Sequence, residues 1–145
     1  MYDNPTAQAL LDAVRLHLET HIIPAIKTDR KLYFQTLVAI NVLRIVEREL
    51  SHDEAHLRSE WNRLHDLLGL DTPAPDSKSG FIHELTAQNQ VLAEAIRSGE
   101  YDSSPELFDH LKATTVSQLE VANPLFLMKI ISEMNNPAQD AWSNR

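Results

Sequence analysis

The stretch LYFQTLVAINVLRIVEREL, residues 32–50, decides the fold. Its apolar residues recur at helical spacing, and they cover most of the circumference of a helix that we expect to run from about Asp29 to Leu50. A helix that is apolar on nearly all sides is typical of the centre of a bundle. The sequence therefore predicts that this helix is the central one of an all-α domain.

A first amphipathic helix is predicted before this stretch. Asp3 or Asn4 is expected as its N-cap, with Pro5 at the first helical position, where a missing N–H costs nothing. Pro24 is expected to kink or end it. Its apolar residues lie three and four positions apart and so share one face: Ala7, Leu11, Val14, Leu18 and Ile22.

A third helix is predicted directly after the central one. Ser51 and Glu54 have the spacing of a capping box, so we expect a helix boundary at Ser51 and a stop at Gly69. Residues 71–80 contain Pro, Ser and Asp without an apolar period, which predicts a loop.

Three more helices are predicted after the loop. A fourth ends at Gly99, and a fifth begins with Ser104 as N-cap. The inner face of the fifth includes Leu107, Leu111, Thr115 and Leu119. A short sixth helix, Leu125 to Met134, follows the Asn-Pro pair that ends the fifth. Short connections between amphipathic helices favour antiparallel neighbours, so we expect an up-and-down bundle of five to six helices.

Length and composition limit the classes of fold and function that this chain can have. The chain has 145 residues, which suits a single domain; we expect it to span residues 1–134, with a tail over 135–145. With 13 Lys and Arg against 21 Asp and Glu, the net charge is −8, which disfavours nucleic acid and anionic membranes as partners. The absence of Cys excludes disulfides and thiol chemistry. We expect no targeting segment, no membrane-spanning helix and a cytoplasmic location.

Two histidine pairs have the spacing of metal ligands. His17 and His21 lie four residues apart, as do His52 and His56, and this spacing lets two imidazoles on one helix face bridge a divalent ion. Neither pair has Glu directly after its first His, so the zinc-protease motif is absent. We take His17 and His21 as a candidate metal pair; the alternative is that all four histidines are solvated or hydrogen-bonded locally. No cofactor is predicted.

Polar residues inside apolar stripes are candidate ligand-binding groups. Asn41 lies in the middle of the most apolar helix, Asn89 lies in the stripe of the fourth, and Thr114, Thr115 and Gln118 share a face of the fifth. A buried amide costs roughly 1–3 kcal/mol unless it is hydrogen-bonded. The two alternatives are an internal polar network that fixes helix register and a cavity lined for a small ligand.

A charged group in the central helix is the remaining candidate. Arg44, Glu47 and Arg48 can form ion pairs locally or with a neighbouring helix, or an Arg in a groove can hold a carboxylate or phosphate. The three glycines, at positions 69, 80 and 99, allow neither a P-loop nor a dinucleotide-binding motif. No catalytic residue is predicted, which favours a protein that is not an enzyme.

The chain resembles a bacterial family of small helical proteins of unknown function. The resemblance rests on NVLRIVERE at residues 41–49, on MYDNPT at 1–6, and on HLKAT at 110–114 through the Asn-Pro at 123–124. Members of that family are associated, as neighbouring genes or by fusion, with aminoglycoside-phosphotransferase-like kinases and with acyl-CoA dehydrogenases. The resemblance implies an accessory role beside such an enzyme and transfers no catalytic residue.

Two functional hypotheses follow. The first is a non-catalytic accessory domain that binds a kinase-like or acyl-CoA-metabolising partner through the apolar sixth helix, with Leu125, Phe126, Met128 and Trp142 at the interface. A homodimer through the same surface is a variant of it. The alternative is a helical bundle, possibly an enzyme, that binds a metal or a small anionic ligand in its core.

Overall fold

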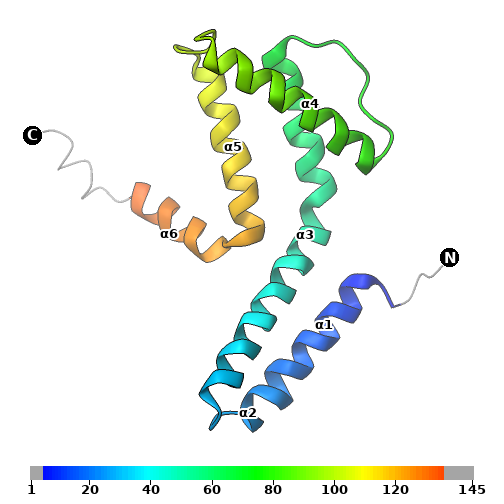
Figure 1. Cartoon of the computed structure of the whole chain (residues 1–145), viewed down its shortest axis with the longest axis vertical. Helices are drawn as coiled ribbons and strands as arrows, with labels where there is room; N and C mark the ends of the chain where they lie inside the picture. Colours follow the sequence, from blue (N-terminus) through cyan, green and yellow to red (C-terminus); the bar gives the residue numbers. More distant parts are fainter. Residues whose placement is uncertain (1–4, 136–145) are drawn as a thin grey trace, which may run out of the picture. The chain divides into compact units, whose positions relative to one another are not determined.

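The computed structural model describes residues 5–135, and within this range the chain forms helices and no strand (Figure 1). The all-α class is therefore confirmed. Residue contacts divide the chain into two units, Met1–His52 and Asp53–Arg145. A single domain over residues 1–134 stays a prediction. The elements in order are α1 (Ala7–His17), the π-helical turn η1 (Leu18–Ile22), α2 (Ile23–Ala25), α3 (Arg30–Leu68), α4 (Lys78–Arg97), α5 (Pro105–Ala122) and α6 (Pro124–Met134).

Helix α1 begins later than the sequence predicts. Its N-cap is Thr6, whose backbone is extended and whose Oγ1 accepts a hydrogen bond from the N–H of Ala9 at 3.1 Å. The prediction of Pro5 at the first helical position is therefore wrong, because a hydroxyl one residue later satisfies the first free N–H groups. Asp3 and Asn4 lie outside the described residues.

Pro24 disturbs the helix as predicted. The preceding turn, η1, is π-helical, and the N–H of Ile23 donates to the carbonyl of Leu18. Because Pro24 has no N–H to donate, regular α-helical bonding cannot continue through it. The chain turns after α2, and the N–H of Leu32 then donates to the Asp29 carboxylate at 3.0 Å, which caps α3.

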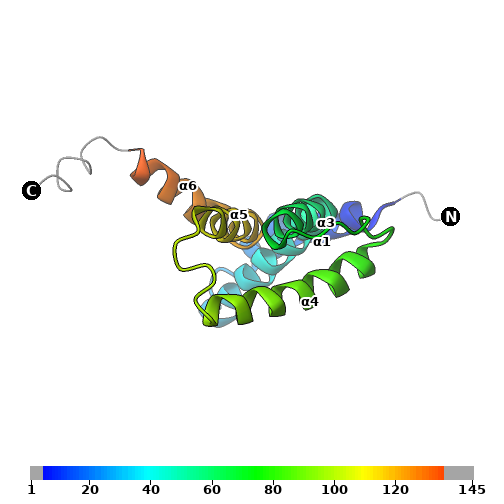
Figure 2. The same ribbon diagram turned by 90° about the horizontal axis from the view of Figure 1, so that it is seen from above.

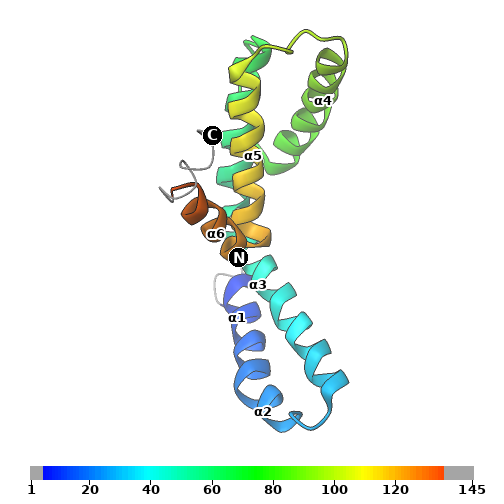
Figure 3. The same cartoon turned by 90° about the vertical axis from the view of Figure 1, so that its left-hand side faces the viewer.

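The first unit is a helical hairpin: α1 runs antiparallel to the first half of α3 (Figure 3). Little of the hairpin is buried. Among its described residues only Thr36 and Ile40 are, and the other large apolar residues of this half of α3 are half-buried or exposed. The prediction of a central, fully covered helix is therefore wrong here, because a single neighbouring helix covers only one face. The exposed ones are Leu32, Phe34, Leu37, Val38, Val42 and Leu50.

Helix α3 continues through Ser51, where the sequence predicts a boundary. The Ser51 hydroxyl donates to the carbonyl of Glu47 at 2.8 Å, as a Ser inside a helix does, and the helix extends for 39 residues to Leu68. The predicted capping box is therefore wrong. No Gly or Pro lies within residues 30–68, so nothing in this stretch interrupts the helix.

The second unit contains a compact apolar core. The second half of α3 lies beside α5, and α4 runs across them, as the end-on view shows (Figure 2). Trp61 and Leu64 of α3 pack with Phe81, Leu85 and Leu92 of α4 to form this core. The Trp61 ring stacks on His65 with ring centroids 3.8 Å apart and meets Phe81 edge-on.

Side-chain caps set the later helix boundaries. Ser77 accepts from the N–H of Gly80 at 3.1 Å, so α4 begins at Lys78, and the predicted loop over 71–80 is shorter than expected. Ser104 caps α5 as predicted, and Asn123, which ends α5 as predicted, also caps α6, which begins at Pro124 instead of Leu125. In the described part of the chain, no helix is long and apolar enough to cross a membrane.

Candidate functional site

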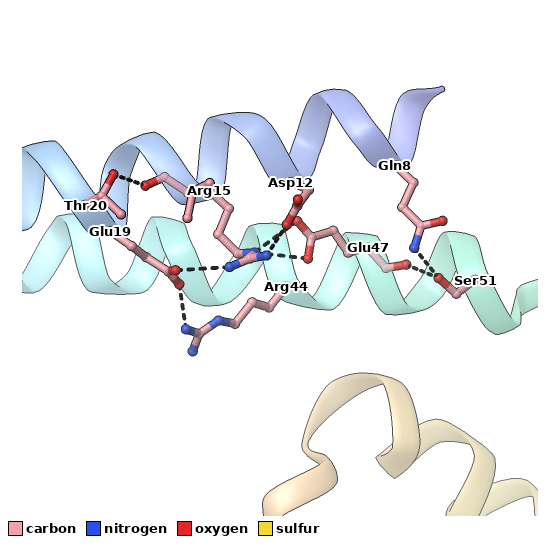
Figure 4. A network of polar contacts seen from close by, with 9 residues as sticks. Gln8, Asp12, Arg15, Glu19, Thr20, Arg44, Glu47 and Ser51 are labelled. Atoms are coloured by element: carbon pink, nitrogen blue, oxygen red, sulfur yellow. Dashed lines mark hydrogen bonds and ion pairs between the residues drawn. The ribbon is translucent and has the colours of Figure 1, made fainter. Parts of the chain in front are cut away.

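An ion-pair network centred on Arg15 joins the two helices of the hairpin (Figure 4). The Arg15 guanidinium contacts Asp12, donates from Nη1 to Glu19 at 3.0 Å, and donates from Nε to Glu47 at 3.1 Å. Arg44 donates to the other oxygen of Glu19 at 2.6 Å. The hydrogen bond to Glu47 raises the pKa of Arg15 above its usual range, because it favours the charged guanidinium.

The network gives Arg44 and Glu47 a structural role. Arg15 and Glu47 are the least exposed members, with 20% and 15% of their side-chain surfaces accessible. Arg44 and Glu47 thus form the inter-helix salt bridges that the sequence allowed as one alternative. Arg48, their half-buried neighbour, also has an interaction partner. Ligand binding by these three residues stays a prediction.

The candidate metal pair lies on one face, as its spacing predicts. The rings of His17 and His21 are stacked with centroids 5.1 Å apart, and His21 Nδ1 lies 2.7 Å from the Thr20 hydroxyl. The described residues contain no group of three or more His, Cys, Asp or Glu side chains that could hold a metal ion. A metal held by these two histidines stays a prediction.

The predicted polar stripe is not buried. Asn41, Asn89, Thr115 and Gln118 are exposed, and only Thr114 is half-buried. Asn89 donates to Glu60 at 3.3 Å, and the Thr115 hydroxyl donates to the carbonyl of Leu111 on its own helix. The burial expected for these residues is therefore wrong, and these contacts do not line an enclosed cavity.

The face of α5 that points inward differs from the predicted one. Leu111 and Thr115 are exposed, whereas His110 is buried, with only 4% of its surface accessible. Leu107 and Leu119 are half-buried as predicted, but between them His110 and Thr114 take the inward positions that the sequence pattern assigned to Leu111 and Thr115. Ser117 and Val121 are half-buried as well.

A cavity of about 670 Å³ lies between α3, α5 and the turn that precedes α5. Arg63 is its one permanently cationic residue, and Tyr101 and Leu67 add apolar surface. Three exposed carboxylates, those of Asp66, Glu106 and Asp109, also line it. The full lining is Arg63, Asp66, Leu67, Tyr101, Ser104, Glu106, Asp109, His110 and Ala113.

Arg63 and His110 line this cavity, and each has one buried nitrogen without a hydrogen-bond partner. Arg63 donates to two neutral hydroxyls, Ser59 at 2.7 Å and Thr114 at 3.3 Å, while its buried Nε has no partner. The buried Nδ1 of His110 has none either. Burial lowers the pKa of His110, and the positive charge of Arg63 lowers it further, while Glu60 acts in the opposite direction. The His110 imidazole is therefore neutral near pH 7.

Sequence reasoning missed both residues. His110 lies three residues after Leu107 and four before Thr114, so its helical position was the available signal. Arg63 precedes the fully buried Leu64, but nothing in one sequence shows which of its 13 basic residues is half-buried.

Helix α6, which carries the predicted interface residues, is largely uncovered. Leu125 exposes 77% of its surface, Phe126 47% and Met128 66%, while Leu127 is buried. Trp142, the fourth predicted interface residue, lies outside the described residues.

A family model described as a domain of unknown function (DUF6285) matches residues 26–126. The chain belongs to this family. The comparisons with curated proteins and with solved structures gave no match.

The DUF6285 segment contains the cavity but not the whole hairpin. All residues that line the cavity lie between positions 63 and 113, inside the matched range. Helix α1, which supplies Arg15, lies before the DUF6285 segment, and most of α6 lies after it. The cavity is thus built entirely from the part of the chain that defines the family.

We expect Arg15→Met to lower the free energy of unfolding by about 1–3 kcal/mol, because it leaves the half-buried Glu47 without its charged partner. Arg44→Met is the matched control: Arg44 is 51% exposed and makes one pair, so its loss should cost less than about 1 kcal/mol. Urea unfolding followed by circular dichroism measures both. Equal losses in the two variants would contradict the central place of Arg15.

We expect acid to destabilise the fold partly through His110. Its folded pKa lies below the unfolded value, so the unfolded chain binds the proton first as the pH falls through about 6.5. Stability is then lost as the pH falls through about 6.5 toward the lower folded pKa, and His110→Gln should reduce that loss. The control is His83→Gln, which removes one imidazole at an exposed position of α4. An unchanged slope in His110→Gln would refute the assignment.

Proposed function

We propose that this chain is a non-catalytic protein-interaction domain that binds a partner enzyme through α6. The exposure of Leu125, Phe126 and Met128 carries the proposal. We call these three residues, together with Ile131 and Met134, the α6 surface.

The α6 surface has the composition of an interface core. Phe and Met are enriched where protein partners meet, and Lys, Glu and Asp are depleted there. All five residues expose at least 47% of their surface, although α6 buries Leu127 against the rest of its unit. Large apolar residues exposed in such number on one short helix favour an interaction site.

The family resemblance supports the kind of partner. It implies an aminoglycoside-phosphotransferase-like kinase or an acyl-CoA-metabolising enzyme. The accessory domain would then bind the enzyme, and the enzyme would carry out the reaction. No catalytic motif is found in the sequence of the chain, which fits this role. A second copy of the chain on the α6 surface is the alternative occupant.

The cavity supports a second candidate function, binding of a small acidic ligand. The observation that favours it is Arg63, a half-buried cation whose hydrogen-bond partners are neutral hydroxyls. Its guanidinium and the neutral His110 suit a carboxylate or phosphate group. The carboxylates of Asp66, Glu106 and Asp109 repel a ligand that is purely anionic and attract an ammonium group. A ligand with both charges, such as an ω-amino acid, fits this lining best.

We expect Phe126→Glu to abolish capture of the partner enzyme from an extract of the native host. The control is Ile82→Glu on α4, because Ile82 and Phe126 both expose 47% of their surface. Affinity capture with the tagged chain and mass spectrometry measure the partner. Recovery of a kinase-like or acyl-CoA enzyme with the unmodified chain and with Ile82→Glu, but not with Phe126→Glu, supports the proposal. Equal recovery with both variants, or recovery of the chain alone, contradicts it.

We expect an ω-amino acid to raise the melting temperature of the chain more than acetate or phosphate does. At a ligand concentration of 100 Kd, binding adds about 2.7 kcal/mol to the stability. Arg63→Met should remove the effect, and Arg97→Met, at an exposed position of α4, should keep it. If none of the three compounds shifts the melting temperature, the cavity does not bind this class of ligand.

A further inference from the structure

An apolar stripe runs along the first half of α3. Its members are Phe34, Val38, Asn41, Val42 and Ile45, and we call them the α3 stripe. Phe34 exposes 66% of its surface, Val38 47% and Val42 51%; Asn41 is exposed and Ile45 half-buried. Steps of four, three and four residues from Phe34 through Val38 and Asn41 to Ile45 are those of a helix seam that packs against another helix.

Among residues 5–52 of its own unit, no element covers this stripe. Its second helix, α1, contacts α3 through the opposite side, where Glu47 and Arg44 meet Arg15 and Glu19. Ile40 is the one buried apolar residue among the described residues of the hairpin. A two-helix hairpin with so small a core gains most of its stability from a further packing partner.

The charges that flank the stripe point to the partner. Lys31 lies seven residues before Val38, and Glu49 lies seven residues after Val42, so both extend the same line on the helix. Both are exposed. The pattern Lys–Val–Val–Glu is therefore symmetric about residue 40, with opposite charges at its two ends.

We infer that the α3 stripe is a dimer interface, on which α3 of a second copy of this chain packs in antiparallel orientation. The two-fold axis passes at the level of residue 40. Val38 then meets Val42 of the second copy, and Lys31 meets Glu49 of the second copy. Because the axis is two-fold, each of these contacts occurs twice.

Charge complementarity selects the antiparallel orientation over the parallel one. In a parallel pair in register, Lys31 faces Lys31 and Glu49 faces Glu49, so both ends of the stripe repel. In the antiparallel pair both ends attract. Two ion pairs at the rim thus set the direction, while the apolar residues between them supply the buried surface.

In this dimer the Asn41 side chain can form hydrogen bonds across the interface. It lies one residue from the axis, so the Asn41 side chains of the two copies are offset by about 3 Å along the helices. Two amides at that distance can donate to and accept from each other. A paired polar residue in an apolar seam fixes the register of the helices, because any slip leaves both amides buried and unpaired.

The test is the mass of the full chain in solution, measured by light scattering on a size-exclusion column over a range of concentrations. We expect a dimer for the unmodified chain and a monomer for Val42→Glu, which places two charges beside the axis. Leu16→Glu is the matched control, because Leu16 on α1 is 52% exposed and Val42 is 51% exposed. Leu16→Glu should stay dimeric, and circular dichroism should show unchanged helix content in both variants.

Charge reversal tests the register. Lys31→Glu and Glu49→Lys should each raise the dimer dissociation constant at least about tenfold at low salt, since each variant places like charges together twice. The double variant should restore it. A monomeric unmodified chain, a dimer that persists in Val42→Glu, or a double variant no tighter than the single ones would overturn the inference. The outcome is independent of the α6 surface, since Phe126→Glu should leave this dimer intact.

Discussion

The structure depends on one constraint: α3 is a single helix from Arg30 to Leu68, without a Gly or Pro in its 39 residues. Its first half provides the acceptor and donor groups, Glu47 and Arg44, that hold α1. Its second half provides Trp61 and Leu64 to the only cluster of buried apolar residues in the described part of the chain. The spacing of the α3 stripe also requires this helix, because a break would move its residues off a common line.

The two units are stabilised by different physical means, and this difference bears on function. The second unit buries aromatic and aliphatic side chains, whereas the hairpin is joined mainly by ion pairs around Arg15. Half-buried ion pairs position helices but contribute little net stability. The hairpin therefore keeps apolar surface available, as α6 does.

The sequence predicts the helices well and their environment poorly. Periodicity placed helices where the long helices lie, although it divided α3 in two at Ser51, and Ser104 caps α5 as predicted, because these signals are local. The helix boundary predicted at Ser51 was wrong because a Ser three residues before a Glu has two possible roles. It can cap a new helix, or its hydroxyl can donate to the carbonyl four residues back inside a continuing helix. The prediction of a covered central helix was wrong because apolar periodicity does not show how many neighbouring helices are present to cover that helix. His110 and Arg63 were missed because burial of a polar group depends on tertiary contacts.

The most direct test of this account is amide hydrogen exchange across residues 48–56 of the full chain. In an uninterrupted helix the N–H groups of His52, Asp53 and Glu54 bond to carbonyls four residues back, so they should exchange as slowly as those of the preceding turn. If Ser51 instead capped a new helix, the N–H groups of His52 and Asp53 would have no partner within that helix, whereas the N–H of Glu54 would bond to the Ser51 hydroxyl. Rapid exchange confined to His52 and Asp53 would contradict the continuous α3 that both units share.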